Sequence, residues 1–452
     1  MKYLSKLKNY YLGRSERSQI VVKNAVCSLS IKVLSIVVDF AKVPVLLSFL
    51  DASHYGVYIT IASIVAWTHQ FDFGLGSGLR YKLTEAISRH DDTRSKQLVS
   101  TAYLSMSAIM LGLFLICVPV IINLNWAKIL NCRFVGAQEL VLCVSMVLAV
   151  FVVQFVLELI SVVLQADQKT AISNFFKPLS NLLTIVSVLL MRQFAHNSLV
   201  LACLAITLPI VVVLFFANTI LFARRYKKIA PAFKDFRKER IIELYSLGLK
   251  YLAGQFSSLV VFSTANFLIS HYVNPTEAAV YNTAWIYFGV LVMFNGMVLT
   301  PLEAAVTDAY VTGEERWIKN IYKKIHLYSL VLTIASLVLL AVSQIAFHLW
   351  VGDKIIVPWS LSIVMTILFI VNIWNTPYMN FLASVGKMNV LVVASFCKIV
   401  IFFPIAIALI KLWGTVGLVM AILIINSLPN YIIGRYQYLL VIQHKAKRIW
   451  NK

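Results

Sequence analysis

The sequence predicts an all-α integral membrane protein with about twelve transmembrane helices arranged in two six-helix bundles. Two features of the composition carry this prediction. Apolar residues make up 60% of the 452 residues, and charged residues make up only 13%; the mean hydropathy is +0.82. A soluble domain has about 25% charged residues, so most of the surface of this protein must face lipid rather than water.

The apolar stretches that predict these helices follow one another along the whole chain. A helix needs about 20 apolar residues to cross the bilayer, and it satisfies its backbone polar groups internally. The predicted spans are 24–50, 54–72, 98–123, 138–164, 175–192, 198–222, 244–271, 278–301, 326–350, 358–382, 389–411 and 415–442. The polar, basic residues 1–23 and the charges within the first span indicate a retained span rather than a cleaved signal.

Lysine and arginine are distributed unequally between the two sides of the predicted membrane protein. If the N-terminus lies inside, the inner side holds the N-terminal tail, the basic central loop 223–243 and most other basic residues. The outer side holds only Lys128, Arg133, Arg192, Lys354 and Lys411. The positive-inside rule therefore places both termini in the cytoplasm. Because the basic residues flank the spans, the net charge of +21 indicates no nucleic-acid partner.

Two short segments predict an internal duplication. The segment DASHYGVY at 51–58 matches NPTEAAVY at 274–281 and places Ser53 over Thr276. Each segment is expected to be an outer turn whose Ser or Thr caps the next helix. Two halves in the same orientation are typical of transporters built from parallel repeats.

The predicted organisation has four parts. An N-terminal bundle with a basic cytoplasmic tail covers 1–222, a basic cytoplasmic linker covers 223–243, a C-terminal bundle covers 244–442, and a cytoplasmic tail covers 443–452. The loops between spans are too short for a catalytic or nucleotide-binding domain, so we expect no enzymatic activity. The cysteine and histidine spacing indicates no metal site, and no cofactor is expected.

Ionisable residues inside the predicted spans are the candidate functional residues, because burying a charge in the bilayer costs several kcal/mol. Lys32, Asp39 and Lys42 share one face of the first span. The candidate substrate-binding residues are Lys32, Lys42, Lys250 and Lys398, and the candidate ion-coupling residues are Asp39 and Glu158. Purely structural roles remain open, as a Lys–Asp pair that fixes helix packing or as a lysine that reaches the interface.

The sign of these charges predicts the ligand. Lysines outnumber carboxylates, so the interior suits an anion such as a pyrophosphate, which lysine binds with charge-assisted hydrogen bonds. Saccharide binding would use aromatic and amide side chains within the spans. Candidates are Trp67, Gln70, Tyr251, Gln255, Asn266, Asn282, Trp285, Asn295, Asn372, Trp374 and Asn375.

One sequence motif gives more specific information than the composition does. The stretch FDFGLGSGLRYKLTE at 71–85 follows the second span. It lacks the preceding strand and the Gly-Lys-[Ser/Thr] ending of a phosphate-binding loop, and its glycines are better explained by close helix packing. The stretch resembles a signature of the Wzx-type O-antigen and polysaccharide flippases. The family-pattern positions are Phe71, Asp72, Gly74, Gly76, Gly78, Leu79 and Arg80.

The resemblance implies more than the composition does. These flippases belong to the multidrug/oligosaccharidyl-lipid/polysaccharide exporter superfamily, so the implied fold is MATE-like. The implied function is to move an undecaprenyl-pyrophosphate-linked oligosaccharide, such as an O-antigen unit, across the bacterial inner membrane by alternating access. Other membrane proteins of polysaccharide assembly are candidate partners, and coupling to a proton or sodium gradient is expected.

Three other functions remain open. A multidrug antiporter of the same fold would need an acidic cavity. A flippase for peptidoglycan lipid precursors usually has additional spans. A polytopic glycosyltransferase or polymerase would need a large outer loop with catalytic carboxylates, which this sequence lacks.

Overall fold

The computed structural model describes residues 16–66, 75–194 and 197–451, and this part of the chain consists of helices joined by short turns and loops, without strands. Eight of the described helical segments are long and apolar enough to cross a membrane. The chain is therefore an all-α, multi-pass membrane protein, as the sequence predicts. Five of the candidate residues lie outside the described residues, namely Trp67, Gln70, Phe71, Asp72 and Gly74.

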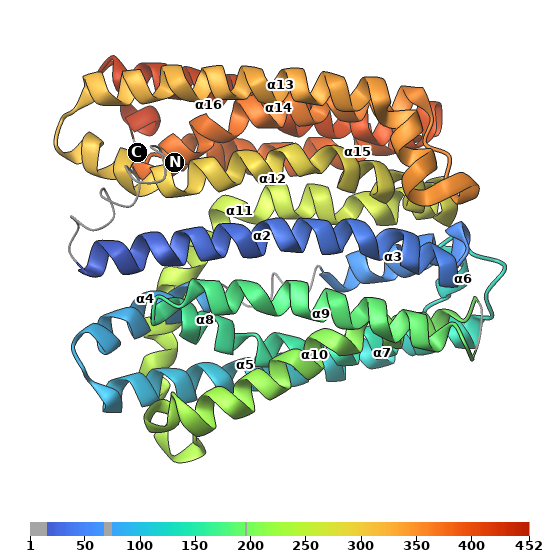
Figure 1. The fold of residues 1–452 in the computed structure, drawn as a ribbon, viewed down its shortest axis with the longest axis horizontal. Coiled ribbons are helices and arrows are strands. Elements are labelled where there is room, and N and C mark those ends of the chain that lie inside the picture. Colours follow the sequence, from blue (N-terminus) through green and yellow to red (C-terminus); the bar gives the residue numbers. More distant parts are fainter. Residues whose placement is uncertain (1–15, 67–74, 195–196, 452) are drawn as a thin grey trace, which may run out of the picture.

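The helices before the linker pack mainly with one another, except α3, which packs mainly on the later helices α11 and α12. They are α2 (Glu16–Phe49), α3 (Ala52–Ala66), α4 (Leu75–Ser88), α5 (Asp92–Asn123), α6 (Trp126–Ile129), α7 (Ala137–Leu157), α8 (Leu159–Ala166), α9 (Thr170–Met191) and α10 (Leu199–Arg224). Figure 1 shows them in the lower part of the molecule, with α2 and α3 next to the helices that follow the linker. The linker itself forms two short turns, η2 (Lys227–Ile229) and η3 (Phe233–Asp235).

The helices after the linker form the upper part of Figure 1. They are α11 (Lys238–Tyr272), α12 (Pro275–Val311), α13 (Glu315–Val351), η4 (Gly352–Lys354), α14 (Trp359–Ser384), α15 (Asn389–Ala421), the π-helix η5 (Ile422–Ser427), α16 (Leu428–Ile442) and η6 (Arg448–Asn451). The backbone of α15 leaves helical geometry at Trp413 and Gly414. This break separates the last two predicted spans.

Several helices extend past the predicted spans. The predicted span 326–350 lies within α13, which begins at Glu315, and α11 begins at Lys238 rather than 244. The added turns are polar, so the helices continue beyond the apolar layer that hydropathy detects. The predicted span 138–164 differs in another way, because it is divided between α7 and α8 at Glu158.

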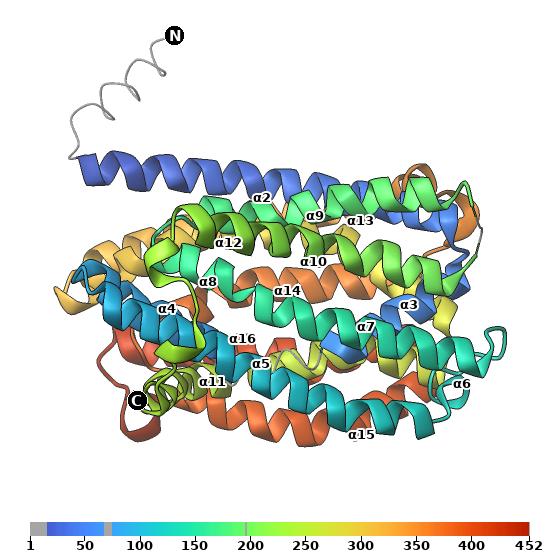
Figure 2. The ribbon, with the colours of Figure 1, turned by 90° about the horizontal axis from the view of Figure 1, so that it is seen from below.

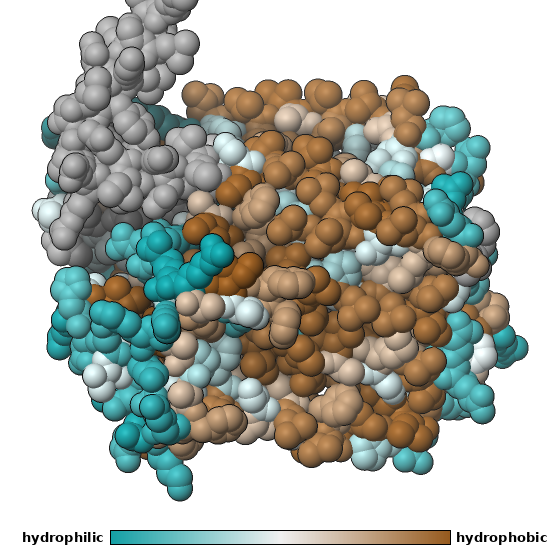
Figure 3. Space-filling model, turned by 60° about the horizontal axis from the view of Figure 1, so that its bottom comes forward, coloured by the Kyte–Doolittle hydropathy of each residue, from teal (hydrophilic) through white to brown (hydrophobic). Residues whose placement is uncertain are grey.

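The molecule has two polar ends and an apolar middle. The linker end carries the α4–α5 turn, the linker, the α12–α13 turn and the C-terminus, and the α6 end carries α6 and the α2–α3 turn (Figures 1 and 2). Figure 3 shows a broad apolar band between hydrophilic residues at the two ends. Large apolar side chains are exposed within this band, including Ile116 at 70%. An exposed apolar belt of this extent is typical of a lipid-facing surface.

The two halves repeat the positions of helix starts. The distance from Ser53 to Thr276 is 223 residues, and the same spacing relates the first residues of α3 and α12 and those of α5 and α13. Ser53 and Thr276 also contact each other, with their hydroxyl oxygens 2.8 Å apart. Nearby, a Cβ on Gly56 would lie only 1.7 Å from the carbonyl oxygen of Pro275, so only glycine permits this approach of α3 and α12.

Helix α11 connects the two halves at the linker end. Figure 1 shows it crossing from the lower group of helices to the upper group. Its first turns pack against α4, where a Cβ on Gly78 would lie 1.9 Å from the carbonyl oxygen of Leu244. Gly78 belongs to the family-pattern motif, and the structure thus gives one of the motif glycines a packing role.

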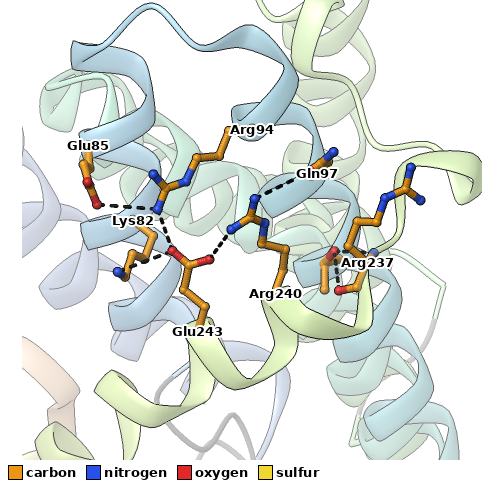
Figure 4. A network of polar contacts seen from close by, with 8 residues as sticks. Lys82, Glu85, Arg94, Gln97, Arg237, Arg240 and Glu243 are labelled. Carbon is orange, nitrogen blue, oxygen red and sulfur yellow. Dashed lines mark hydrogen bonds and ion pairs between the residues drawn. The ribbon is translucent and has the colours of Figure 1, made fainter.

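An ion-pair network fixes the same end of α11 (Figure 4). Glu243 accepts hydrogen bonds from Arg94 of α5 at 2.6 Å and from Arg240 at 2.7 Å. Lys82 of α4 lies 3.3 Å away. Burial alone would raise the pKa of the Glu243 carboxyl, but the hydrogen bonds from these three cations outweigh it and lower the pKa to about 2.

Candidate functional site: a charged cavity between the halves

Two adjoining cavities lie between the two groups of helices. The first, of about 480 Å³, is bounded by α2, α8, α9, α10 and α12. The second, of about 420 Å³, is bounded by α2, α9, α12 and α14. Asp39 and Lys177 line both cavities, so the two spaces meet at these side chains.

A polar cluster forms where α2 packs on α9. The carboxylate of Asp39 lies 3.8 Å from the ammonium of Lys42 and 3.4 Å from that of Lys177. Asn181 joins the cluster through both ends of its amide. Its Nδ2 donates to Asp39 at 2.6 Å, and its Oδ1 accepts from Lys42 at 3.1 Å. The cluster is therefore held together by contacts between two helices.

Two further charges face the first cavity. Lys32 lies about two turns before Asp39 on the same face of α2 and lines the cavity. Glu158 lines it from the junction between α7 and α8. Among the described residues, three lysines and two carboxylates therefore line the paired cavities.

The position of Glu158 depends on a break in the helix. Asn218 of α10 donates hydrogen bonds to the carbonyl oxygens of Leu157 and Leu214, each at 2.8 Å. Tyr103 in turn donates to Asn218 at 2.7 Å. A buried carbonyl left free by a helix break must find another donor, and Asn218 supplies it. The break between α7 and α8 is thus a stabilised feature that places Glu158 at the cavity.

The opposite wall of the cavities is apolar. In the first cavity α12 contributes Met293, Gly296 and Met297. In the second, Trp285 of α12 and Phe369 of α14 form the wall, with their ring centroids 4.9 Å apart. Within the described residues, every charged side chain of the cavities comes from helices before the linker. One wall can bind an anion and the other can contact apolar or ring-shaped groups.

The cavities are closed toward the α6 end by contacts between the halves. Besides the Ser53–Thr276 contact, the Asn131 amide donates to the carbonyl oxygen of Val273 at 3.0 Å. The Trp350 indole donates to the carbonyl oxygen of Phe40 at 2.8 Å. These bonds join segments of the first half to the C-terminal end of α11, to α12 and to α13, so the two halves are held together on the α6 side of the cavities.

The structure brings together four of the predicted site residues, namely Lys32, Asp39, Lys42 and Glu158. Lys398 lies apart from them. It is buried on α15, where only 6% of its surface is exposed, and it donates a hydrogen bond to Asn430 of α16. Lys250 lies on α11, and its side chain is outside the described residues.

The described motif positions are also away from the cavities. Gly76, Gly78, Leu79 and Arg80 lie on α4 at the linker end, where Leu79 is fully buried and Arg80 is exposed. Of the described aromatic and amide candidates for saccharide binding, Trp285 lines a cavity. Others serve helix packing; Asn295, for example, is buried and donates to the carbonyl oxygen of Ile373 at 3.1 Å.

Two residues of the cluster are not among the predicted site residues. Lys177 lies within the predicted span 175–192, in the second turn of α9, and pairs with Asp39. Asn181 follows it by four residues and therefore shares its face of the helix. A polar pair at this spacing inside an apolar stretch was the signal that could have identified both residues.

Comparison with known proteins identifies the family. The profile of the family described as polysaccharide biosynthesis protein matches residues 21–307. The chain belongs to this polysaccharide biosynthesis family. A relative in Yersinia pseudotuberculosis, provisionally described as an O-antigen export protein, is 21% identical over 367 residues, which cover 79% of this chain and 82% of the relative.

Solved structures of MOP-superfamily transporters have the same fold as this protein. A multidrug resistance MATE transporter in an inward-facing conformation aligns with a TM-score of 0.75 at 15% identity, over 94% of this chain and 100% of that chain. The outward-facing conformation of such a transporter gives 0.61 at 14% identity, over 95% and 97%. A MOP transporter from Pyrococcus furiosus, described as having a binding pocket of reversed polarity, gives 0.62 at 14%, over 96% and 98%. The predicted MATE-like fold is confirmed.

Proposed function

We propose that this protein is a flippase that moves a pyrophosphate-linked, lipid-anchored oligosaccharide across the bacterial inner membrane. The observation that carries the proposal is the contrast between the two walls of the central cavities. Lysines of α2 and α9 face a wall of methionine, tryptophan and phenylalanine. A substrate with an anionic linkage between a sugar and a lipid has the same division of chemistry.

The lysines suit the anionic linkage. Lys32 and Lys177 both line the first cavity, and each ammonium group can donate charge-assisted hydrogen bonds to phosphate oxygens. Asp39 already neutralises part of this charge through Lys42 and Lys177. A partly compensated cavity binds an anion without holding it so tightly that release becomes slow.

The closed α6 end supports an inward-facing state. The linker end carries most of the basic residues, so we assign it to the cytoplasm together with both termini. The higher similarity to the inward-facing transporter supports the same assignment. Transport then requires the contacts between α3 and α12 at the α6 end to open while the linker end closes.

A proton or sodium gradient is the proposed energy source. Asp39 and Glu158 are the carboxylates that line the first cavity. Neutralising Asp39 would release Lys42 and Lys177 from their common partner, so cation binding and anion binding at this cluster are linked. In this scheme both carboxylates are ion-coupling residues.

The test is a transport assay with purified protein in liposomes that contain a polyprenyl-pyrophosphate-linked oligosaccharide. A lectin outside the liposomes binds the sugar that has crossed the bilayer, and the increase in bound lectin with time gives the transport rate. Lys42→Glu should slow this rate by about 100-fold or more, because it replaces an attractive group of the cavity with a repulsive one. Lys238→Glu, at an exposed position of the linker end, is the matched control and should retain the rate.

Two results would contradict the proposal. The first is an unchanged rate for Lys42→Glu at equal protein abundance. The second is export of cationic drugs with no movement of the lipid-linked sugar, which would favour a multidrug antiporter of the same fold.

A further inference from the structure

A second basic pocket lies on the outside of the C-terminal helices. It has a volume of about 430 Å³ and is bounded by α13 and α16 at the linker end. Arg316, Lys319, Lys323 and His326 of α13 line it. Figure 1 places α13 at the edge of the molecule, on the far side of α12 from α2. The pocket is therefore separate from the central cavities.

The floor of this pocket is aromatic and rigid. Tyr322 and Tyr438 line it and are stacked, with ring centroids 4.9 Å apart. The Tyr322 hydroxyl donates to the carbonyl oxygen of Pro377 at 2.9 Å, and the His326 ring is 2.8 Å from the Tyr378 hydroxyl. The basic side chains thus surround an aromatic surface that is hydrogen-bonded to α14.

The cations of the pocket are incompletely neutralised. Lys319 lies 3.7 Å from Glu315, which also contacts His444. Within the described residues, no ion pair involves Arg316 or Lys323. These two side chains are exposed at the linker end and can accept an anion from outside the protein.

The repeat-related helix α5 shows the opposite arrangement. Its basic residues are paired with acids of the linker and of α11, with Lys96 at 3.0 Å from Asp235 and Arg94 at 2.6 Å from Glu243. The linker also packs on α5, since the backbone amide of Ala232 donates to Ser100 at 3.1 Å. The protein covers and neutralises this site in one half and leaves its counterpart open in the other.

An apolar strip continues from the basic pocket into the membrane region. On the face of α13 that carries Lys323, steps of three or four residues lead to Leu327, Leu330 and Ile334. These side chains are 64%, 48% and 55% exposed. A cationic pocket directly followed by an exposed apolar strip matches an anionic headgroup with its acyl chains.

We propose that this groove is a binding site for an anionic phospholipid. The headgroup phosphate lies between Arg316 and Lys323, and an acyl chain lies along Leu327, Leu330 and Ile334. The site does not depend on the transported substrate, because it uses none of the residues of the central cavities. It holds a lipid of the cytoplasmic leaflet against the half of the protein that the linker does not cover.

Native mass spectrometry of the full-length protein in detergent tests this site with dioleoyl phosphatidylglycerol as the probe. The double variant Arg316→Gln/Lys323→Gln should bind the lipid about 30-fold more weakly than the wild type. Lys324→Gln removes a charge from the next residue of α13, which does not line the pocket, and should bind within threefold of the wild type. Dihexanoyl phosphatidylglycerol should bind more weakly than the dioleoyl lipid.

Each opposite result overturns the proposal. Unchanged binding by the double variant, or equal binding of phosphatidylcholine, would rule out recognition of the anionic headgroup. Full competition by inorganic phosphate, or equal binding of the short-chain lipid, would indicate a simple anion site. Tighter binding of a polyprenyl phosphate that is lost in the same double variant would assign the groove to the transported lipid. Lys42→Glu should leave phosphatidylglycerol binding unchanged, so the test is separate from the test of transport.

Discussion

Helices α2 and α11 are the first helices of the two halves, but their side chains differ in chemistry. The spacing of 223 residues that relates Ser53 to Thr276 places Lys32, Asp39 and Lys42 over Gln255, Phe262 and Ala265. The charges of α2 line the central cavities. Phe262 instead packs on Trp285, with ring centroids 5.3 Å apart. The same position is thus ionic in one half and aromatic in the other.

The two helices also differ in their attachment. Helix α2 packs mainly on α9 of its own half, whereas α11 begins against α4 and α5 of the other half through Gly78 and Glu243. The comparison shows that helices at matching positions of the two halves can have different tasks. Helix α2 supplies charges of the cavities, whereas α11 supports the cavity residue Trp285 through Phe262 and connects the halves.

The largest expected effect comes from removing the charge that distinguishes α2. Asp39→Asn leaves Lys42 and Lys177 without their common carboxylate and should slow transport roughly 100-fold, which corresponds to about 3 kcal/mol in the free energy of activation. The counterpart Phe262→Leu should change the rate less than fivefold. Sugar exposure in liposomes measures both variants. Equal rates for the two variants would remove the functional distinction between the helices.

An intermediate effect on stability is expected from the attachment of α11. Gly78→Ala forces a Cβ against the carbonyl oxygen of Leu244 and should lower the free energy of unfolding by about 1–3 kcal/mol. Gly112→Ala on α5 is the control, since a Cβ there meets no atom within 4 Å, and it should be neutral or stabilising. Thermal unfolding in detergent compares them. A stable Gly78→Ala variant would show that α11 does not depend on this contact.

The smallest effect is expected from Glu243 and depends on pH. The pKa of Glu243 is about 2 in the folded protein, against an ordinary value of 4.5. Its carboxylate therefore stabilises the fold above pH 4.5, and this contribution is lost as the pH falls from 4.5 toward 2. Glu243→Gln should be less stable than the wild type by about 1 kcal/mol at pH 7, with a smaller difference at pH 3.

Glu239→Gln serves as the matched control for this experiment. Glu239 is exposed one turn earlier on α11, so its variant should follow the wild type at both pH values. A stability difference for Glu243→Gln that does not change with pH would mean that the ion pairs at the start of α11 contribute nothing.

Most of the fold could be predicted from the sequence, because lipid allows few structures and hydropathy detects them. The face shared by Lys32, Asp39 and Lys42 followed from helical spacing alone. The break at Glu158 could not be predicted, since it depends on a hydrogen bond from Asn218, which lies 61 residues from Leu157. Lys398 shows the same limit. Its depth in the span was evident, but the packing of α15 on α16 decides that it faces Asn430 rather than the cavities.

The contact between Ser53 and Thr276 has a consequence for how the sequence can change. Because their hydroxyl groups contact each other, a change at either position alters the surroundings of the other. Both retain a hydroxyl, and beside them Gly56 corresponds to the small residue Ala279. Lys32, Asp39 and Lys42 lie on a helix that does not touch its counterpart in this way. A substitution in the cavity therefore changes the surroundings of one half, whereas a substitution at the Ser53–Thr276 contact changes those of both.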